Sequence, residues 1–172
     1  MGRYDESIAQ YQKALDLQPK FAPLATMVGN LYLAKGDLET ARKYYNQALS
    51  VDPNFAIAIA NIAWVDAQEG TNLDVALGLA QKAKSLMPEV PSITDTLGWV
   101  MYKRGSYDSA VPLLQECVQK SPNSATFRFH LGMTLLAAGQ KAKGKEELGA
   151  ALRMNLDAPD SQQARLALGG AN

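Results

Sequence analysis

Prolines and glycines recur through this chain at one fixed interval. Pro19, Pro53, Pro88 and Pro122 stand 34, 35 and 34 residues apart, and the same three intervals separate Gly36, Gly70, Gly105 and Gly139. An apolar stretch of helical length lies between each proline and the next glycine, and a second one between that glycine and the following proline. A period of this length predicts pairs of helices that stack on one another, because a single pair cannot bury its apolar face alone.

Small residues keep fixed places within this period. Gly29, Ala63, Gly98 and Gly132 each follow a proline by ten residues, and Ala48, Ala83, Cys117 and Ala151 close the second helical stretch. Side chains of this size let neighbouring helices approach closely. The one longer interval has its extra residue after Gly70, so we expect it in the turn at residues 71–73.

These columns resemble the tetratricopeptide repeat (TPR), which couples Leu-Gly and Tyr on a first helix to Ala, an aromatic residue, Ala and a closing Pro on the second. The clearest unit carries Val28-Gly29, Tyr32, Gly36, Ala41, Tyr45, Ala48 and Pro53. Other units depart from the pattern, for example at Asp66 and Leu156. The resemblance implies an all-α fold, a right-handed α-solenoid of antiparallel helix pairs.

The same phase divides the chain into segments. We expect the second helix of a truncated repeat at residues 1–19, repeats at 20–53, 54–88, 89–122 and 123–156, and a capping helix with a tail at 157–172. Natural repeat stacks end in polar caps. Tyr4, Ile8 and Tyr11 would instead be exposed, which suggests a fragment of a longer array and a possible homo-oligomer through this open helix.

The C-terminal segment has the marks of a cap. Asp157 and Pro159 are typical of a helix start, and Gly169-Gly170 of a helix end. We therefore expect a helix at roughly 158–168, in which Ala164 and Leu168 cover the last helix pair.

Composition excludes several kinds of partner. The chain has 17 basic and 17 acidic residues, so it offers no electrostatic footprint for nucleic acid. The longest uncharged run, residues 21–34, is too short for membrane insertion. Cys117 is the single cysteine and occupies a packing column, so no intrachain disulfide can form and the redox compartment stays open.

Signs of catalysis are missing. His130 is the single histidine, and no glycine-rich phosphate loop occurs. We expect no enzyme, no catalytic or metal-binding residue and no cofactor.

The resemblance assigns the concave groove to the first helices, where a protein or peptide partner would bind. The implied groove residues are Met27, Asn30, Asn61, Trp64, Gln68, Asp95, Trp99, Tyr102, Phe129, His130 and Met133. Both tryptophans of the chain fall in this set, and Trp and Tyr are frequent binding hot spots. We expect an exposed aromatic groove; the alternative is that these rings pack on neighbouring first helices and form a closed core.

Asn30 and Asn61 match two positions of family members that clamp the carboxylate tail of chaperones. The basic positions of that clamp are Thr26, Ser92 and Thr96 here, which disfavours a chaperone co-factor role. The two amides remain candidates either for hydrogen bonds to the backbone of an extended peptide or for local capping.

The string Asp95-Thr96-Leu97-Gly98-Trp99 resembles bacterial repeat proteins of exopolysaccharide and envelope export. The sequence therefore predicts a protein-interaction scaffold, with a self-assembly scaffold or a regulatory array of a larger enzyme as alternatives. The compartment stays open: cytoplasmic, or periplasmic and cell envelope if the export resemblance holds.

Overall fold

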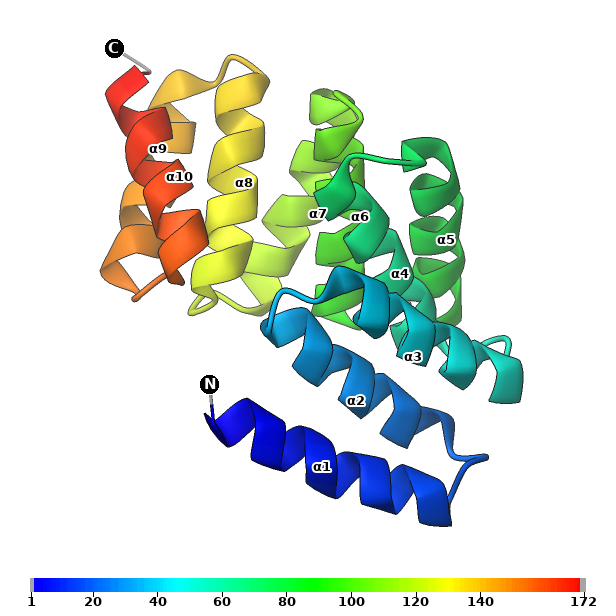
Figure 1. The fold of residues 1–172 in the computed structure, drawn as a ribbon. Coiled ribbons are helices and arrows are strands. Elements are labelled where there is room, and N and C mark those ends of the chain that lie inside the picture. Colours follow the sequence, from blue (N-terminus) through cyan, green and yellow to red (C-terminus); the bar gives the residue numbers. More distant parts are fainter. Residues whose placement is uncertain (1, 171–172) are drawn as a thin grey trace. The chain divides into compact units, whose positions relative to one another are not determined.

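The computed structural model describes residues 2–170, which are helical and contain no strand. Met1, Ala171 and Asn172, which belong to the first and last expected segments, lie outside the described residues. The chain divides into two compact units, unit 1 (Met1–Pro88) and unit 2 (Glu89–Asn172). Figure 1 shows the helices in chain order: α1 (Gly2–Leu17), α2 (Ala22–Ala34), α3 (Leu38–Val51), α4 (Ala56–Glu69), α5 (Leu73–Leu86), α6 (Pro91–Lys103), α7 (Tyr107–Lys120), α8 (Ala125–Ala137), α9 (Lys141–Arg153) and α10 (Ala158–Gly170).

The repeating prolines and glycines mark the ends of the helices. Each of the four prolines lies two residues after α1, α3, α5 or α7. Gly36, Gly70, Gly105 and Gly139 follow the first helix of each pair with φ between 68° and 80°. Because residues with a Cβ rarely adopt this left-handed backbone, glycine ends the helix there and reverses the chain into the second helix.

The extra residue of the second pair lies where the spacing predicted it. Gly70 ends α4 directly, and two residues rather than one then separate it from α5. Asn72 absorbs the insertion by adopting a left-handed backbone with φ 51°. The insertion is thereby confined to the turn, and α5 begins in its usual phase.

Small residues allow the two helices of a pair to interlock. A Cβ added at Gly29 would lie 2.5 Å from the Tyr45 ring, and one added at Gly98 would lie 2.7 Å from Leu114 Cγ. Tyr45 and Leu114 are fully buried. Cys117 occupies such a position as well: it is buried, and its thiol donates a hydrogen bond to the Pro91 carbonyl at 3.3 Å.

The outer helices differ in part from the expectation. Ile8 is only 5% exposed, so the prediction that it lies open to water is wrong, whereas Tyr4 is 44% exposed. At the other end, Ala164 is fully buried and Leu168 half-buried. Helix α10 begins at Ala158 as predicted and extends to Gly170, two residues beyond the expected end at 168. Within residues 2–170, no helix combines the length and apolar composition needed to cross a bilayer.

A matched pair of glycine substitutions tests the interlocking. Gly98→Ala should lower the free energy of unfolding by about 1–3 kcal/mol, because its Cβ would overlap Leu114. Gly78→Ala should raise the free energy of unfolding by up to about 1 kcal/mol, since Gly78 is an exposed residue of α5 and an added Cβ would have no atom within 4 Å. Urea unfolding of both variants checks the opposite signs; equal effects would show that close approach at Gly98 is unimportant.

Candidate functional site

The predicted groove residues of unit 1 lie on an accessible face. Asn30 on α2 is exposed and Asn61 on α4 half-buried. Met27 is one turn before Asn30, and Ile57 one turn before Asn61, so each pair shares a helix face. Met27 and Ile57 are both 40% exposed. These four residues are called the amide face below.

The two asparagines are brought together directly. Asn61 Nδ2 donates to Asn30 Oδ1 at 2.8 Å, and the Tyr45 hydroxyl donates to the same oxygen at 2.9 Å. Burial raises the pKa of the Tyr45 hydroxyl well above its usual range, so this group remains a donor at physiological pH. The position of Asn30 is therefore fixed from the core side by α3 and from the side of α4 by Asn61.

The amide pair keeps unused hydrogen-bonding capacity. Asn30 Oδ1 accepts two hydrogen bonds, which leaves the NH₂ group of Asn30 and the carbonyl oxygen of Asn61 without a partner among residues 2–170. If the oxygen and nitrogen of both side-chain amides are exchanged, the Asn61 NH₂ group and the Asn30 oxygen are the groups without a partner. In either orientation the pair keeps one free amide nitrogen and one free amide oxygen.

The other two predicted groove residues of unit 1 are as accessible as Asn61. Trp64 is half-buried and packs against the core of unit 1. Gln68, one turn further along α4, is half-buried too. They border the amide face rather than project from it.

The predicted groove residues of unit 2 are largely inside the protein. Trp99 is 3% exposed, Phe129 0%, His130 3% and Asp95 6%. The expectation of an exposed aromatic groove is wrong for these residues; the alternative, a closed core, describes them. Whether any of them contacts a partner remains a prediction.

Ring stacking explains this burial. The Trp99 ring lies 4.0 Å from the His130 ring and 4.6 Å from the Tyr102 ring, centroid to centroid, and both pairs are stacked. Phe129 is tilted at 5.9 Å from Trp99. Lys103 Nζ lies 5.2 Å from the Trp99 ring centre, a cation–π contact. Trp99, Tyr102, Phe129 and His130 are called the aromatic cluster below.

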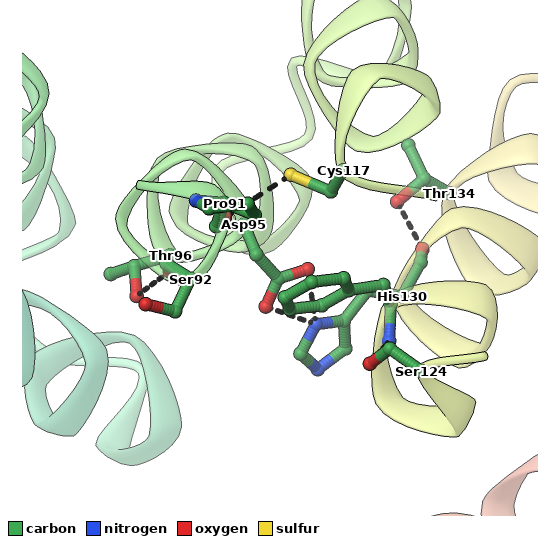
Figure 2. Close-up of polar contacts among 9 residues, drawn as sticks. Pro91, Ser92, Asp95, Thr96, Cys117, Ser124, His130 and Thr134 are labelled. Carbon is green, nitrogen blue, oxygen red and sulfur yellow. Dashed lines mark hydrogen bonds and ion pairs between the residues drawn. The ribbon is translucent and has the colours of Figure 1, made fainter. Parts of the chain in front are cut away.

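Asp95 and His130 form a buried pair between α6 and α8, which Figure 2 shows in close-up. His130 Nδ1 lies 2.9 Å from both carboxyl oxygens of Asp95 and donates to them. The Thr134 hydroxyl donates to the His130 carbonyl at 2.7 Å. An Asp–His pair is the acid–base part of many hydrolytic centres. Here both residues are more than nine-tenths buried, and the Trp99 and Phe129 rings contact the imidazole, an environment that fits a structural pair.

Helix α10 lies close enough to His130 and Lys103 for its Asp160 to interact with both. Burial raises the pKa of the half-buried Asp160 carboxyl, while the charges of His130 and Lys103 act in the opposite direction. Further along α10, an open surface depression of about 450 Å³ is lined by this helix, α6, α8 and the first residue of α9. Tyr102 and Met133, two of the predicted groove residues, line it. The repeat pattern did not predict that residues of α10 line this site, because it assigns groove residues to the first helices only.

Metal binding has no support in the described part of the chain. No group of three or more His, Cys, Asp or Glu side chains there could hold a metal ion.

Comparisons with known proteins agree with the repeat architecture. A family model described as tetratricopeptide repeat matches residues 1–63 and 101–169. The solved structure of YrrB, described as a TPR protein with an unusual peptide-binding site, has a TM-score of 0.65 at 24% identity, covering 94% of this chain and 81% of that one. This likeness shows the fold, an all-α solenoid of helix pairs.

Two curated relatives are much longer than this chain. BBSome complex member BBS4 of Bos taurus is 26% identical over 151 residues, which cover 88% of this chain and 29% of that protein. Cellulose synthase 1 operon protein C of Komagataeibacter xylinus is 26% identical over 161 residues, 92% of this chain and 12% of that protein. The second match agrees with the resemblance to bacterial export-system repeat proteins. The chain thus spans less than a third of either relative.

Substitutions at the buried pair test its structural role. His130→Leu should lower the free energy of unfolding by about 3 kcal/mol, because it leaves the Asp95 carboxyl buried without its partner. The double variant Asp95→Leu, His130→Leu should regain most of that loss, since two apolar side chains need no hydrogen bond. Urea unfolding measures both; a neutral single variant would return the two residues to the binding candidates.

Proposed function

Because the chain belongs to the tetratricopeptide-repeat family, we propose that it is a protein-interaction module that binds an extended segment of a partner protein on the amide face of unit 1. The observation that carries the proposal is the hydrogen bond between Asn61 and Asn30, held by Tyr45. TPR folds commonly serve protein–protein interaction, and the related fold of YrrB is described as having a peptide-binding site.

The amide pair matches the chemistry of a peptide backbone. One residue of an extended chain presents an N–H and a C=O to the same side, and the free donor and acceptor of the pair can satisfy both. Such contacts do not involve the side chains of the partner, so they give affinity for an extended backbone rather than for one sequence.

The apolar residues beside the amides supply the side-chain preference. Met27 and Ile57 each lie one turn from an amide and are partly exposed. Met adapts its shape readily to different apolar groups. The four residues of the amide face carry no charge, so the preferred partner is an uncharged segment with apolar side chains, not an acidic tail.

Self-association through α1 is the competing function. We rank it below peptide binding because of the burial of one residue. Ile8, the central apolar residue of the expected open edge, is buried within unit 1. Glu6, Gln10 and Lys13 on the same helix are exposed. The exposed apolar residues of this helix, Tyr4 and Leu17, lie near its opposite ends rather than in one patch, which gives little hydrophobic driving force for a second copy. We also propose that the chain performs no catalytic step of its own.

Peptide display tests the amide face. A random peptide library panned against the purified domain should enrich a common uncharged motif on the wild type and not on Asn61→Ala. The affinity of the enriched peptide, measured by calorimetry, should fall about tenfold in this variant, since one hydrogen bond is lost. Asn46→Ala, on the exposed surface of α3, is the matched control. Equal enrichment on wild type and Asn61→Ala would contradict the proposal.

Light scattering tests the competing function separately. We expect the mass of one chain over a wide concentration series, because the described surface of α1 is largely polar. A mass that doubles with concentration, and that Tyr4→Ser returns to one chain, would favour self-association through α1.

A further inference from the structure

We propose that α10 is a displaceable cover of the α6–α8 face of unit 2, and that Asp160 in its first turn limits how tightly this helix docks. In the closed position α10 lies beside Tyr102, His130 and Met133. In the open position these side chains become accessible from its side. The inference concerns unit 2 alone and does not depend on the amide face of unit 1.

Helix α10 runs along side chains that the repeat pattern assigned to the groove. It packs on α8 and α9, as Figure 1 shows. Near its start, Asp160 is close enough to His130 for their charges to interact. Near its end, Ala167 lines the surface depression together with Tyr102 and Met133. Three of the predicted groove residues of unit 2 therefore have α10 as a neighbour.

The apolar contact that holds α10 is small. Ala164 is the one residue of this helix that is fully buried, whereas α8, which also has 13 residues, buries six. Leu166 is 69% exposed. The helix ends in Gly169 and Gly170, and glycine is a poor helix former. An element with so few buried contacts opens at a lower free energy than the hairpins beside it.

A carboxylate works against docking. Asp160 is half-buried, and its carboxyl has no hydrogen bond or ion pair with residues 2–170. Burial raises the pKa of this carboxyl, and the charge of Asp157 adds to that effect. The charges of His130 on α8 and Lys103 on α6 act in the opposite direction without cancelling it. The ionised form of Asp160 is therefore less stable in the closed position than in water.

The raised pKa makes docking depend on pH. A closed form that holds the proton more tightly is favoured most below pH 3.8, the ordinary value for Asp, and loses this advantage as pH rises and Asp160 ionises. Protonation of His130, which is bonded to Asp95, adds a positive charge near Asp160 and acts in the same direction. Lysine side chains titrate far above neutral pH, so Lys103 on α6 and Lys141 on α9 add no step in this range.

Hydrogen exchange of the backbone amides at residues 163–168 measures the opening of α10 in the whole chain. At pH 7, Asp160→Asn should raise their protection about three- to tenfold, because a neutral amide loses less than a carboxylate when it leaves water. Gln162→Lys changes the charge of α10 by the same amount on its exposed side and should not raise protection. Unchanged protection in Asp160→Asn, or an equal rise in both variants, would overturn the proposal.

The same exchange experiment at two pH values identifies the titrating group. After correction for intrinsic exchange rates, the wild type should gain protection in α10 between pH 7 and pH 4.5, and Asp160→Asn should gain clearly less. An equal gain in both proteins would show that Asp160 does not control docking.

A second variant tests whether α10 covers the α6–α8 face. Ala164→Asp places a charge at the one buried position of α10 and should detach the helix. In a Trp64→Phe background, acrylamide should then quench Trp99 fluorescence at least about twofold more strongly, because Trp99 stacks on Tyr102 and His130. Leu166→Asp, at an exposed position, is the control and should not change quenching.

Unchanged quenching in an Ala164→Asp variant that keeps its helical circular dichroism would contradict the role of α10 as a cover. The exchange experiment does not depend on this variant, because Asp160→Asn removes no buried apolar contact. A failure of Ala164→Asp to fold therefore leaves the proposal open to refutation by exchange.

Discussion

The close approach of the two helices in the pairs α2–α3, α6–α7 and α8–α9 is the constraint on which the other features depend. Gly29 accommodates the Tyr45 ring, Gly98 accommodates Leu114, and Gly132 accommodates Leu148, each at a distance that a Cβ would make impossible. The second helix therefore inserts a large side chain into the backbone of the first. This fixes the rotation of α2, α6 and α8 about their axes, and with it the residues of these helices that remain on the surface.

The orientations of Asn30 in unit 1 and of Trp99 in unit 2 follow from that fixed rotation, because each residue comes directly after a glycine of this kind. In unit 1 it turns Asn30 toward Asn61 while Tyr45, the residue that fills the space at Gly29, reaches the amide from behind. In unit 2 the same geometry turns Trp99 inward, onto His130, and leaves Tyr102 at the edge of a surface depression. One repeat position thus has two outcomes: Asn30 is exposed where Trp99, its equivalent, is buried. Side-chain size and neighbours decide between them.

Periodicity was sufficient to predict the fold, since the turns at Gly36 and Gly105 need only local backbone chemistry. It also predicted the insertion in the turn at residues 71–73, where Asn72 adopts a left-handed backbone. It could not predict the burial of Trp99, Phe129 and His130, because that depends on stacking between α6 and α8, which no spacing encodes. Nor did it reveal the pairing of Asn30 with Asn61 or the depression beside α10: both arise from residues of different helices that meet only after folding.

The Tyr45 hydroxyl has a thermodynamic consequence. It belongs to a residue with no exposed surface, yet it bonds the amide that we propose as the contact with a partner. Any ligand that orders Asn30 also strengthens this bond, and binding to the folded state alone stabilises that state. Occupancy of the surface is thereby linked to the opening equilibrium of the α2–α3 hairpin, so a bound partner would slow hydrogen exchange of amides far from the contact.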